Sequence, residues 1–106
     1  SGSGPAYVFL LAEALTEAGV RVGLPLEAAS KLATQTVYGS GKLLHGSSEP
    51  PAELRRRVTS PGGTTQAGLA RMEELGLRAA LVSGVEAARD RGRELGRDAA
   101  EKLAKG

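Results

Sequence analysis

The stretch VTSPGGTT (residues 58–65) decides how this chain folds, because it separates a short helical pattern from a longer one. Hydroxyl side chains crowd the stretch. A proline stiffens it, and two glycines let other groups approach the backbone closely. The four hydroxyls belong to Thr59, Ser60, Thr64 and Thr65. The residues from Thr65 to Leu75 then predict a helix, whose first N–H groups have no acceptor inside the helix.

The start of this helix has the chemistry of a site for a small anion. Free N–H groups, the positive end of the helix dipole and nearby hydroxyls all favour a carboxylate or a phosphate. The same residue types also make an ordinary capped turn, since Ser, Thr, Pro and Gly are the usual residues of turns. On composition alone the ordinary turn is the simpler interpretation, and both interpretations remain open at this point.

The composition fits one modest helical domain. The chain has 106 residues, 15 glycines and only 3% aromatic residues, so its core must be built from Leu, Val and Ala with closely packed helices. The absence of cysteine excludes disulfides, thiol catalysis and Cys-ligated metal, and the single His45 excludes a multi-His zinc site. A net charge of +2 does not by itself indicate a nucleic-acid partner.

No apolar run approaches the roughly 20 residues of a membrane span, and no signal peptide is visible. We therefore expect a soluble cytoplasmic protein with no membrane partner. Ser1 to Gly4 has the composition of a linker remnant, and Gly2 and Gly4 do not form a dinucleotide fingerprint, because no strand precedes them.

Helical periodicity predicts an all-α fold of about five helices, with no strand. The predicted helices run from Pro5 to Gly19, from Pro25 to about Leu44, from Pro50–Pro51 to Arg57, from Thr65 to Leu75, and from about Arg78 past Lys102. We expect Gly19 to end the first helix in the left-handed conformation, and Gly76 to end the fourth. The interior glycines Gly39, Gly41, Gly84, Gly92 and Gly96 indicate close approach of another helix, or else a local weakness or break.

Two further features are weighed against ordinary structural roles. The run Arg55-Arg56-Arg57 has the charge of a phosphate or nucleic-acid contact, but it also fits a solvated helix end, where cations offset the dipole. His45 has the chemistry of a general acid or base, but it also fits the exposed end of a helix. In both cases we favour the ordinary role, and we expect no nucleic-acid partner.

Several segments occur in an order that is typical of one enzyme family. They are SGSGPAYVF (residues 1–9), AGV (18–20) with GLP (23–25), VTSPGGTT (58–65), GLR (76–78) and VEAA (85–88). Together they resemble the C-terminal domain of pyrroline-5-carboxylate reductases, over residue 1 to about residue 96. The residues SPGG with Thr65 carry most of the specificity. The resemblance favours a substrate loop over an ordinary turn, and native sequence over a linker at residues 1–4.

The resemblance implies that this domain interlocks with the same domain of a second subunit into a dimeric helical bundle, and that such dimers build rings in many members. The family reduces 1-pyrroline-5-carboxylate to L-proline with NADPH or NADH. Its N-terminal Rossmann domain, which holds the cofactor, has no counterpart in this sequence. We therefore expect residues 1–106 to be one dimerisation and substrate-loop domain that binds no cofactor and no metal and is inactive alone.

The resemblance also implies roles for individual residues. The substrate carboxylate is expected on the N–H groups of Gly63 and Thr64, within a loop that also contains Ser60 and Gly62, and Thr65 is expected to bond the ring nitrogen and relay a proton. Glu49, beside Ser48, is the nearest match to a glutamate of the family, and the resemblance implies that it is a second candidate catalytic residue, with Thr65. The alternatives are a non-catalytic helical dimerisation module and, more remotely, a nucleic-acid binder that uses Arg55-Arg56-Arg57.

Overall fold

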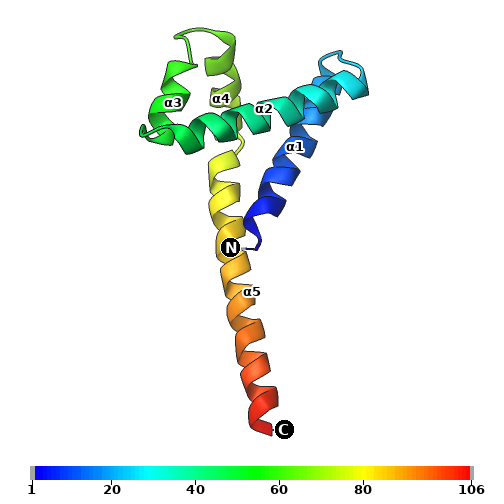
Figure 1. The fold of residues 1–106 in the computed structure, drawn as a ribbon, viewed down its shortest axis with the longest axis vertical. Coiled ribbons are helices and arrows are strands. Elements are labelled where there is room, and N and C mark those ends of the chain that lie inside the picture. Colours follow the sequence, from blue (N-terminus) through cyan, green and yellow to red (C-terminus); the bar gives the residue numbers. More distant parts are fainter. Residues whose placement is uncertain (1, 106) are drawn as a thin grey trace. The chain divides into compact units, whose positions relative to one another are not determined.

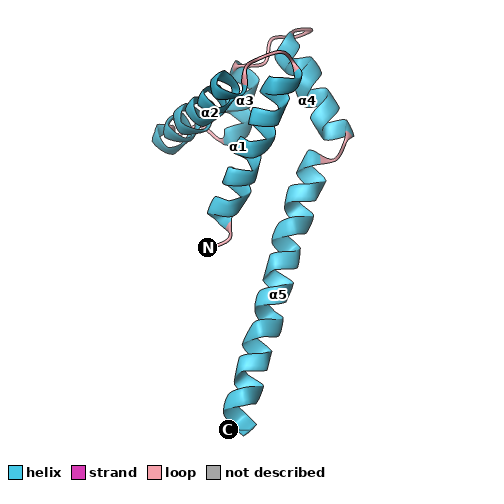
Figure 2. Cartoon of the chain, turned by 90° about the vertical axis from the view of Figure 1, so that its right-hand side faces the viewer, coloured by secondary structure: helices cyan, strands magenta, loops and turns pink. Residues whose placement is uncertain are grey.

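The structure is a computed structural model that describes residues 2–105. These residues form five α-helices and no strand (Figures 1 and 2), which confirms the all-α prediction. The helices are α1 (Gly4–Arg21), α2 (Leu26–Gly46), α3 (Pro51–Arg57), α4 (Thr64–Glu74) and α5 (Leu77–Lys105). They fall into two compact units. The first contains α1, α2 and α3, and the second contains α4, α5 and the loop before them.

The first unit is built on the packing of α1 against α2. We predicted that Gly19 ends the first helix, and this is wrong, because α1 continues to Arg21 and the left-handed residue is Gly23, with φ of 113°. Gly19 has another use. A Cβ built on Gly19 would lie 2.8 Å from the Cβ of Ala29, closer than side chains tolerate. The absence of a side chain at Gly19 therefore lets α2 approach α1.

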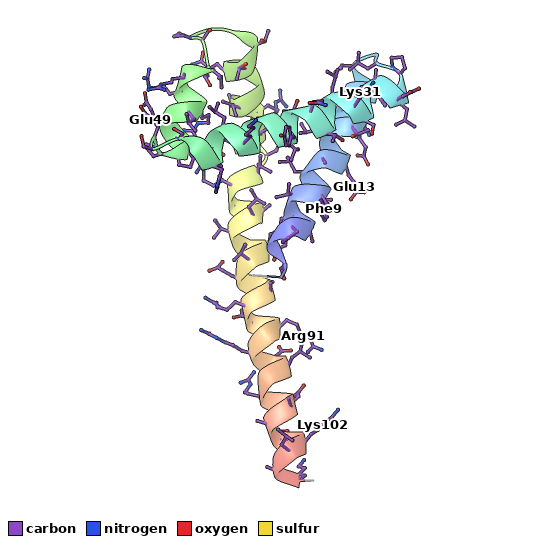
Figure 3. All side chains as sticks on the ribbon, viewed as in Figure 1. Phe9, Glu13, Lys31, Glu49, Arg91 and Lys102 are labelled. Carbon is purple, nitrogen blue, oxygen red and sulfur yellow. The ribbon has the colours of Figure 1, made fainter. Side chains whose placement is uncertain are left out.

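The interior of this unit is very small. Among the described residues only Ala29 and Ala33 are buried, and both lie on α2, one turn apart. Large apolar side chains remain exposed, and the 66% exposed Phe9 on α1 is an example (Figure 3). A 106-residue domain ordinarily buries about 65% of the surface of its unfolded chain. One copy of this chain leaves much of its apolar surface in contact with water.

Helix α2 is continuous through Gly39 and Gly41, so a break at these residues did not occur. A Cβ added at either glycine would meet nothing within 4 Å among the described residues. The close helix approach that these glycines predicted is therefore not made within the first compact unit. The helix ends at Gly46, two residues later than predicted, and His45 is exposed in its last turn.

In the second unit, α4 ends as predicted. Gly76 has φ of 89°, and its N–H donates to the carbonyl oxygen of Glu73 over 3.0 Å. Helix α5 follows and contains 29 residues, none of them buried.

Within residues 2–105, none of the helices combines the length and the apolar character needed to cross a membrane. No group of three or more His, Cys, Asp or Glu side chains in this part of the chain could hold a metal ion.

Candidate functional site

The loop before α4 is shaped by a tight turn. The N–H of Gly63 donates to the carbonyl oxygen of Ser60 over 3.0 Å, and Gly62 between them has φ of 72°. Proline at the second position and a glycine with positive φ at the third are the features of a type II turn. The sequence order Ser-Pro-Gly-Gly thus dictates the local backbone, and the turn delivers the chain to the first residue of α4 at Thr64.

The first turn of α4 presents N–H groups that the helix itself does not use. Thr64, Thr65 and Gln66 are its first three residues, and the first helical bond runs from the Ala67 N–H to the Gly63 carbonyl, over 3.2 Å. No side chain caps the helix at Gly63. Thr64 and Thr65 are both exposed. This arrangement can bind an anion through backbone N–H groups and can offer the two threonine hydroxyls beside it.

The N–H of Gly63 is less available than the sequence suggested. We expected it to bind a carboxylate together with the N–H of Thr64, but in this structure it is donated to Ser60. The space around Gly63 is also tight, since a Cβ there would lie 3.2 Å from the Ser60 carbonyl oxygen. The first N–H group that is free of the turn is that of Thr64. A carboxylate at this helix start would therefore rest on Thr64 and its successors.

Gln66 belongs to this loop, and sequence reasoning missed it. Its side-chain oxygen Oε1 accepts a hydrogen bond from the N–H of Gly62. A Gln or Glu three residues after the N-cap commonly reaches back to the chain before the helix, as in the capping box. The N-cap here is Gly63, so the spacing to Gln66 was the available indication. Gln66 thereby satisfies the N–H of the one residue in the loop with a positive φ.

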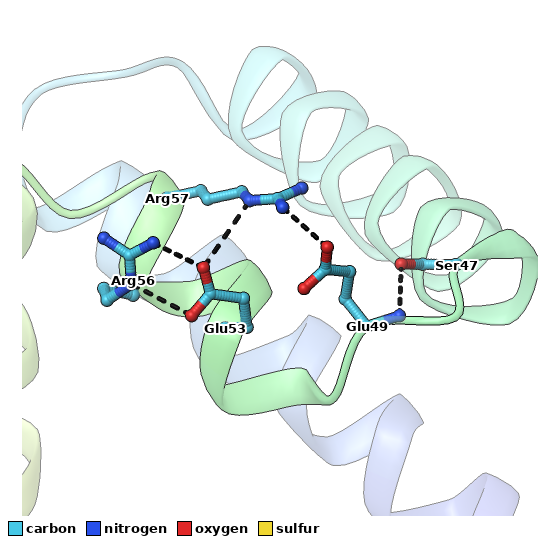
Figure 4. A network of polar contacts seen from close by, with 5 residues as sticks. All are labelled: Ser47, Glu49, Glu53, Arg56 and Arg57. Atoms are coloured by element: carbon cyan, nitrogen blue, oxygen red, sulfur yellow. Dashed lines mark hydrogen bonds and ion pairs between the residues drawn. The ribbon is translucent and has the colours of Figure 1, made fainter.

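Glu49 lies in the first compact unit and joins a different group of side chains (Figure 4). Its Oε1 is 2.7 Å from Nη2 of Arg57, and its backbone N–H donates to Oγ of Ser47 over 3.0 Å. Arg57 Nε also lies 3.8 Å from Oε1 of Glu53. The Arg57 side chain thus links the loop after α2 to α3. Glu49 is engaged in this ion pair, and its predicted part in a substrate site remains a prediction.

Glu53 is the most strongly paired carboxylate of this group. Arg56 donates to both of its oxygens, one of these bonds from Nε to Oε2 over 3.0 Å. The hydrogen bond from Arg56 lowers the pKa of Glu53 below its usual value, partial desolvation opposes this shift, and the charge of Arg57 adds to it. The same pairing raises the pKa of Arg56. Arg56 and Arg57, at the end of α3, therefore pair with carboxylates of their own chain.

The family model described as pyrroline-5-carboxylate reductase dimerisation matches residues 1–95. The chain belongs to this family. The resemblance stated from the sequence is thus confirmed, and it includes Ser1, whose placement lies outside the described residues.

Relatives of known identity agree. The chain is 53% identical over 97 residues to a pyrroline-5-carboxylate reductase of Synechocystis, an alignment that covers 92% of this chain and 36% of that protein. The solved reductase of Coxiella burnetii matches with a TM-score of 0.83 and 42% identity, over 88% of this chain and 34% of that one. The pyrroline carboxylate reductase of Plasmodium falciparum, solved with NADP bound, matches with a TM-score of 0.79 and 41% identity, over 83% of this chain and 34% of that one.

This dimerisation domain therefore spans about a third of the length of the relatives that it matches. The matches establish the family and the all-α fold. They do not assign the residues of the loop.

Proposed function

We propose that this chain is the dimerisation and substrate-loop domain of a pyrroline-5-carboxylate reductase and that it functions as a homodimer. The observation that carries the assembly is the small interior, in which only Ala29 and Ala33 are buried among the described residues. Each Å² of apolar surface removed from water contributes about 25 cal/mol. A second copy of the chain provides the surface against which the exposed side chains of α1 and α2 become buried.

The glycines of α2 support the same assembly. Gly39 and Gly41 each cost about 1 kcal/mol relative to alanine in a helix interior. Nothing among the described residues of the first compact unit occupies the space that a Cβ would take at either position. Contact with a helix of a second copy gives these two residues a function, because it brings another backbone close to α2.

The proposed substrate site is the start of α4. The carboxylate of 1-pyrroline-5-carboxylate binds the N–H groups of Thr64, Thr65 and Gln66, where the helix dipole favours a negative charge. The N–H of Gly63 joins them when the turn to Ser60 opens, and the Ser60 hydroxyl lies beside the same turn. The Thr65 hydroxyl then hydrogen-bonds the ring nitrogen. A threonine hydroxyl is a weak acid, so its contribution is to orient the ring and relay a proton.

In the full enzyme, NADPH or NADH would supply a hydride to the carbon of the C=N bond, and a proton would be added at nitrogen. A dinucleotide fingerprint requires a glycine-rich turn between a strand and a helix, and residues 2–105 contain no strand that could provide one. These residues therefore do not fit the dinucleotide. We assign its binding to a part of the full enzyme outside this sequence. The chain's own contribution is to hold the substrate still, which lowers the barrier by fixing the geometry of attack.

Amide chemical shifts test the substrate site without the cofactor. L-Proline at millimolar concentration is expected to shift the backbone amides of Thr64, Thr65 and Gln66. Pyrrolidine, which has the ring but no carboxylate, is the matched control and is expected to leave them unchanged. Equal responses to the two ligands, or a proline response confined to other parts of the chain, would contradict a carboxylate site at the start of α4.

A further inference from the structure

A narrow apolar stripe runs along α5 from Leu81 to Leu103. Its members are Leu81, Val85, Ala88, Leu95, Ala99 and Leu103. At 100° of rotation per residue, these six positions fall within an arc of about 80° on the helix surface. None of the 29 residues of α5 is buried, and Leu103 is 83% exposed. Apart from the half-buried Ala88, the stripe is a helix face that remains open to solvent within its own compact unit.

The C-terminal end of α5 has little else to stabilise it as a helix. Gly92 and Gly96 each cost about 1 kcal/mol relative to alanine. Arg91 and Glu94, three residues apart, form an exposed ion pair at 2.8 Å. Such a pair stabilises a helix by about 0.2–0.5 kcal/mol. Isolated helices without a packed face are marginal in water even when their residues favour the helix. A contact along the stripe supplies the missing stability.

The stripe is continuous with the dimerisation domain. Leu81, Val85, Ala88 and Leu95 lie inside the part of the chain that the family model matches, which ends at residue 95. Ala99 and Leu103 lie beyond it and extend the same face by two further turns. No change of helix direction or helix end separates the two parts, because α5 runs without interruption from Leu77 to Lys105.

The charges of the last ten described residues suit a partner of mixed charge. Three cations, Arg97, Lys102 and Lys105, lie among two carboxylates, Asp98 and Glu101, and Lys102 projects from α5 (Figure 3). A face of one sign would favour nucleic acid or an acidic membrane surface. A mixture of signs instead favours a surface that also carries both signs, such as another copy of this helix.

We propose that residues 96–105 extend the dimer contact beyond the family domain, by packing the stripe of α5 against the same stripe of a second copy. This inference rests on the proposed homodimer and adds a contact to it. Gly92 and Gly96 allow the two helices to approach closely, and Leu95, Ala99 and Leu103 fill the contact. The charged residues at its margins remain in water and pair across it.

Two single substitutions of the same kind test this contact in the full chain. Ala99→Glu places a carboxylate in the stripe, and Ala100→Glu places one about 100° around the helix. Both alanines are exposed in one copy, and both new carboxylates have a cation three residues away, Lys102 for Ala99→Glu and Arg97 for Ala100→Glu. Sedimentation equilibrium, with urea added to bring dissociation into range, is expected to show at least tenfold weaker self-association for Ala99→Glu than for Ala100→Glu.

Equal self-association of the two variants, in a chain that dimerises, would overturn the inference and leave the proposed homodimer standing. A chain that is monomeric without any substitution would overturn both. Hydrogen exchange on the unaltered chain covers the case in which Ala99→Glu does not fold. Amides of residues 96–105 are expected to lose protection on dilution below the dimer dissociation constant, and protection that does not depend on concentration would contradict the contact.

Discussion

The N–H of Gly63 donates to the carbonyl oxygen of Ser60 over 3.0 Å, and this bond closes the turn from which α4 begins. Gly62 lies inside the turn with φ of 72°, a value that side chains disfavour. The shape of the proposed substrate loop thus depends on one backbone bond and one left-handed residue. The N–H groups that follow, beginning with Thr64, take no part in this turn and remain for a ligand.

Gly62→Ala is expected to destabilise the loop by about 1–2 kcal/mol, because a Cβ is strained at positive φ. The control is Gly23→Ala, which also places a Cβ at a positive φ, here 113°, in the turn between α1 and α2. Both variants are expected to lower the melting temperature. Only Gly62→Ala is expected to reduce the response of the Thr64 amide to L-proline. Loss of that response in both variants alike would contradict a local role for the turn.

Gln66→Ala is expected to free the N–H of Gly62 and to loosen the loop, at a cost of about 0.5–2 kcal/mol, as for the loss of a helix cap. Gln66→Glu retains an oxygen acceptor at the same distance along the side chain and is expected to restore most of the stability. Thermal unfolding of the two variants measures the difference. If Gln66→Glu is as unstable as Gln66→Ala, the hydrogen bond to Gly62 does not order the loop.

The ion pairs of α3 predict a dependence on pH. The pKa of Glu53 is lowered from its usual value of 4.5, chiefly by the hydrogen bond from Arg56. A lowered pKa in the folded state means that the pairing stabilises α3 above pH 4.5 and that this contribution is lost as the pH falls through the folded value. Hydrogen-exchange protection of α3 is therefore expected to be level from neutral pH down to about 5 and to decline below that.

Glu53→Gln is the variant that tests this pairing. It is expected to lower the protection of α3 at neutral pH and to remove the acid-dependent decline. Glu86→Gln, on α5, removes one carboxylate from another helix and is expected to leave both features of α3 unchanged. A decline of the same size in Glu53→Gln would assign the acid sensitivity to a different group.

Gly19→Ala is expected to push α1 and α2 apart, because the new Cβ would lie 2.8 Å from the Cβ of Ala29. Overpacking of this kind typically costs about 1–3 kcal/mol. Gly19→Ala combined with Ala29→Gly removes the clash and is expected to regain part of the loss, as measured by urea unfolding. If the double variant is no more stable than the sum of the two single changes, the contact between these residues is not the cause.

Much of the fold follows from local chemistry in the sequence. Gly76 ended α4 where predicted, because a glycine with positive φ closes a helix at little cost. Gly19 shows where that reasoning fails. Its position near the end of a helical pattern favoured a helix stop, but the close approach of Ala29, which belongs to the next helix, gives it a packing role instead. The hydrophobic periodicity of a helix does not reveal which residue of another helix it contacts.

The candidate loop was likewise predicted in part from the sequence and missed in part. The sequence correctly placed a turn before α4, since Ser-Pro-Gly-Gly has the residues of a type II turn. It did not reveal that the Gly63 N–H is used to close that turn, because this depends on the actual φ of Gly62. The ion pair between Glu49 and Arg57 was also missed. These residues are eight positions apart, across the start of α3, and no helical spacing predicts their contact.

The mass of the unaltered chain in solution tests the central claim most directly. Sedimentation equilibrium over a range of chain concentrations is expected to give twice the 10.9 kDa mass of one chain, or a multiple of that dimer. The physical reason is the small interior of a single copy, in which only Ala29 and Ala33 are buried among the described residues. A stable, folded chain that keeps the mass of one copy at every concentration would contradict the account.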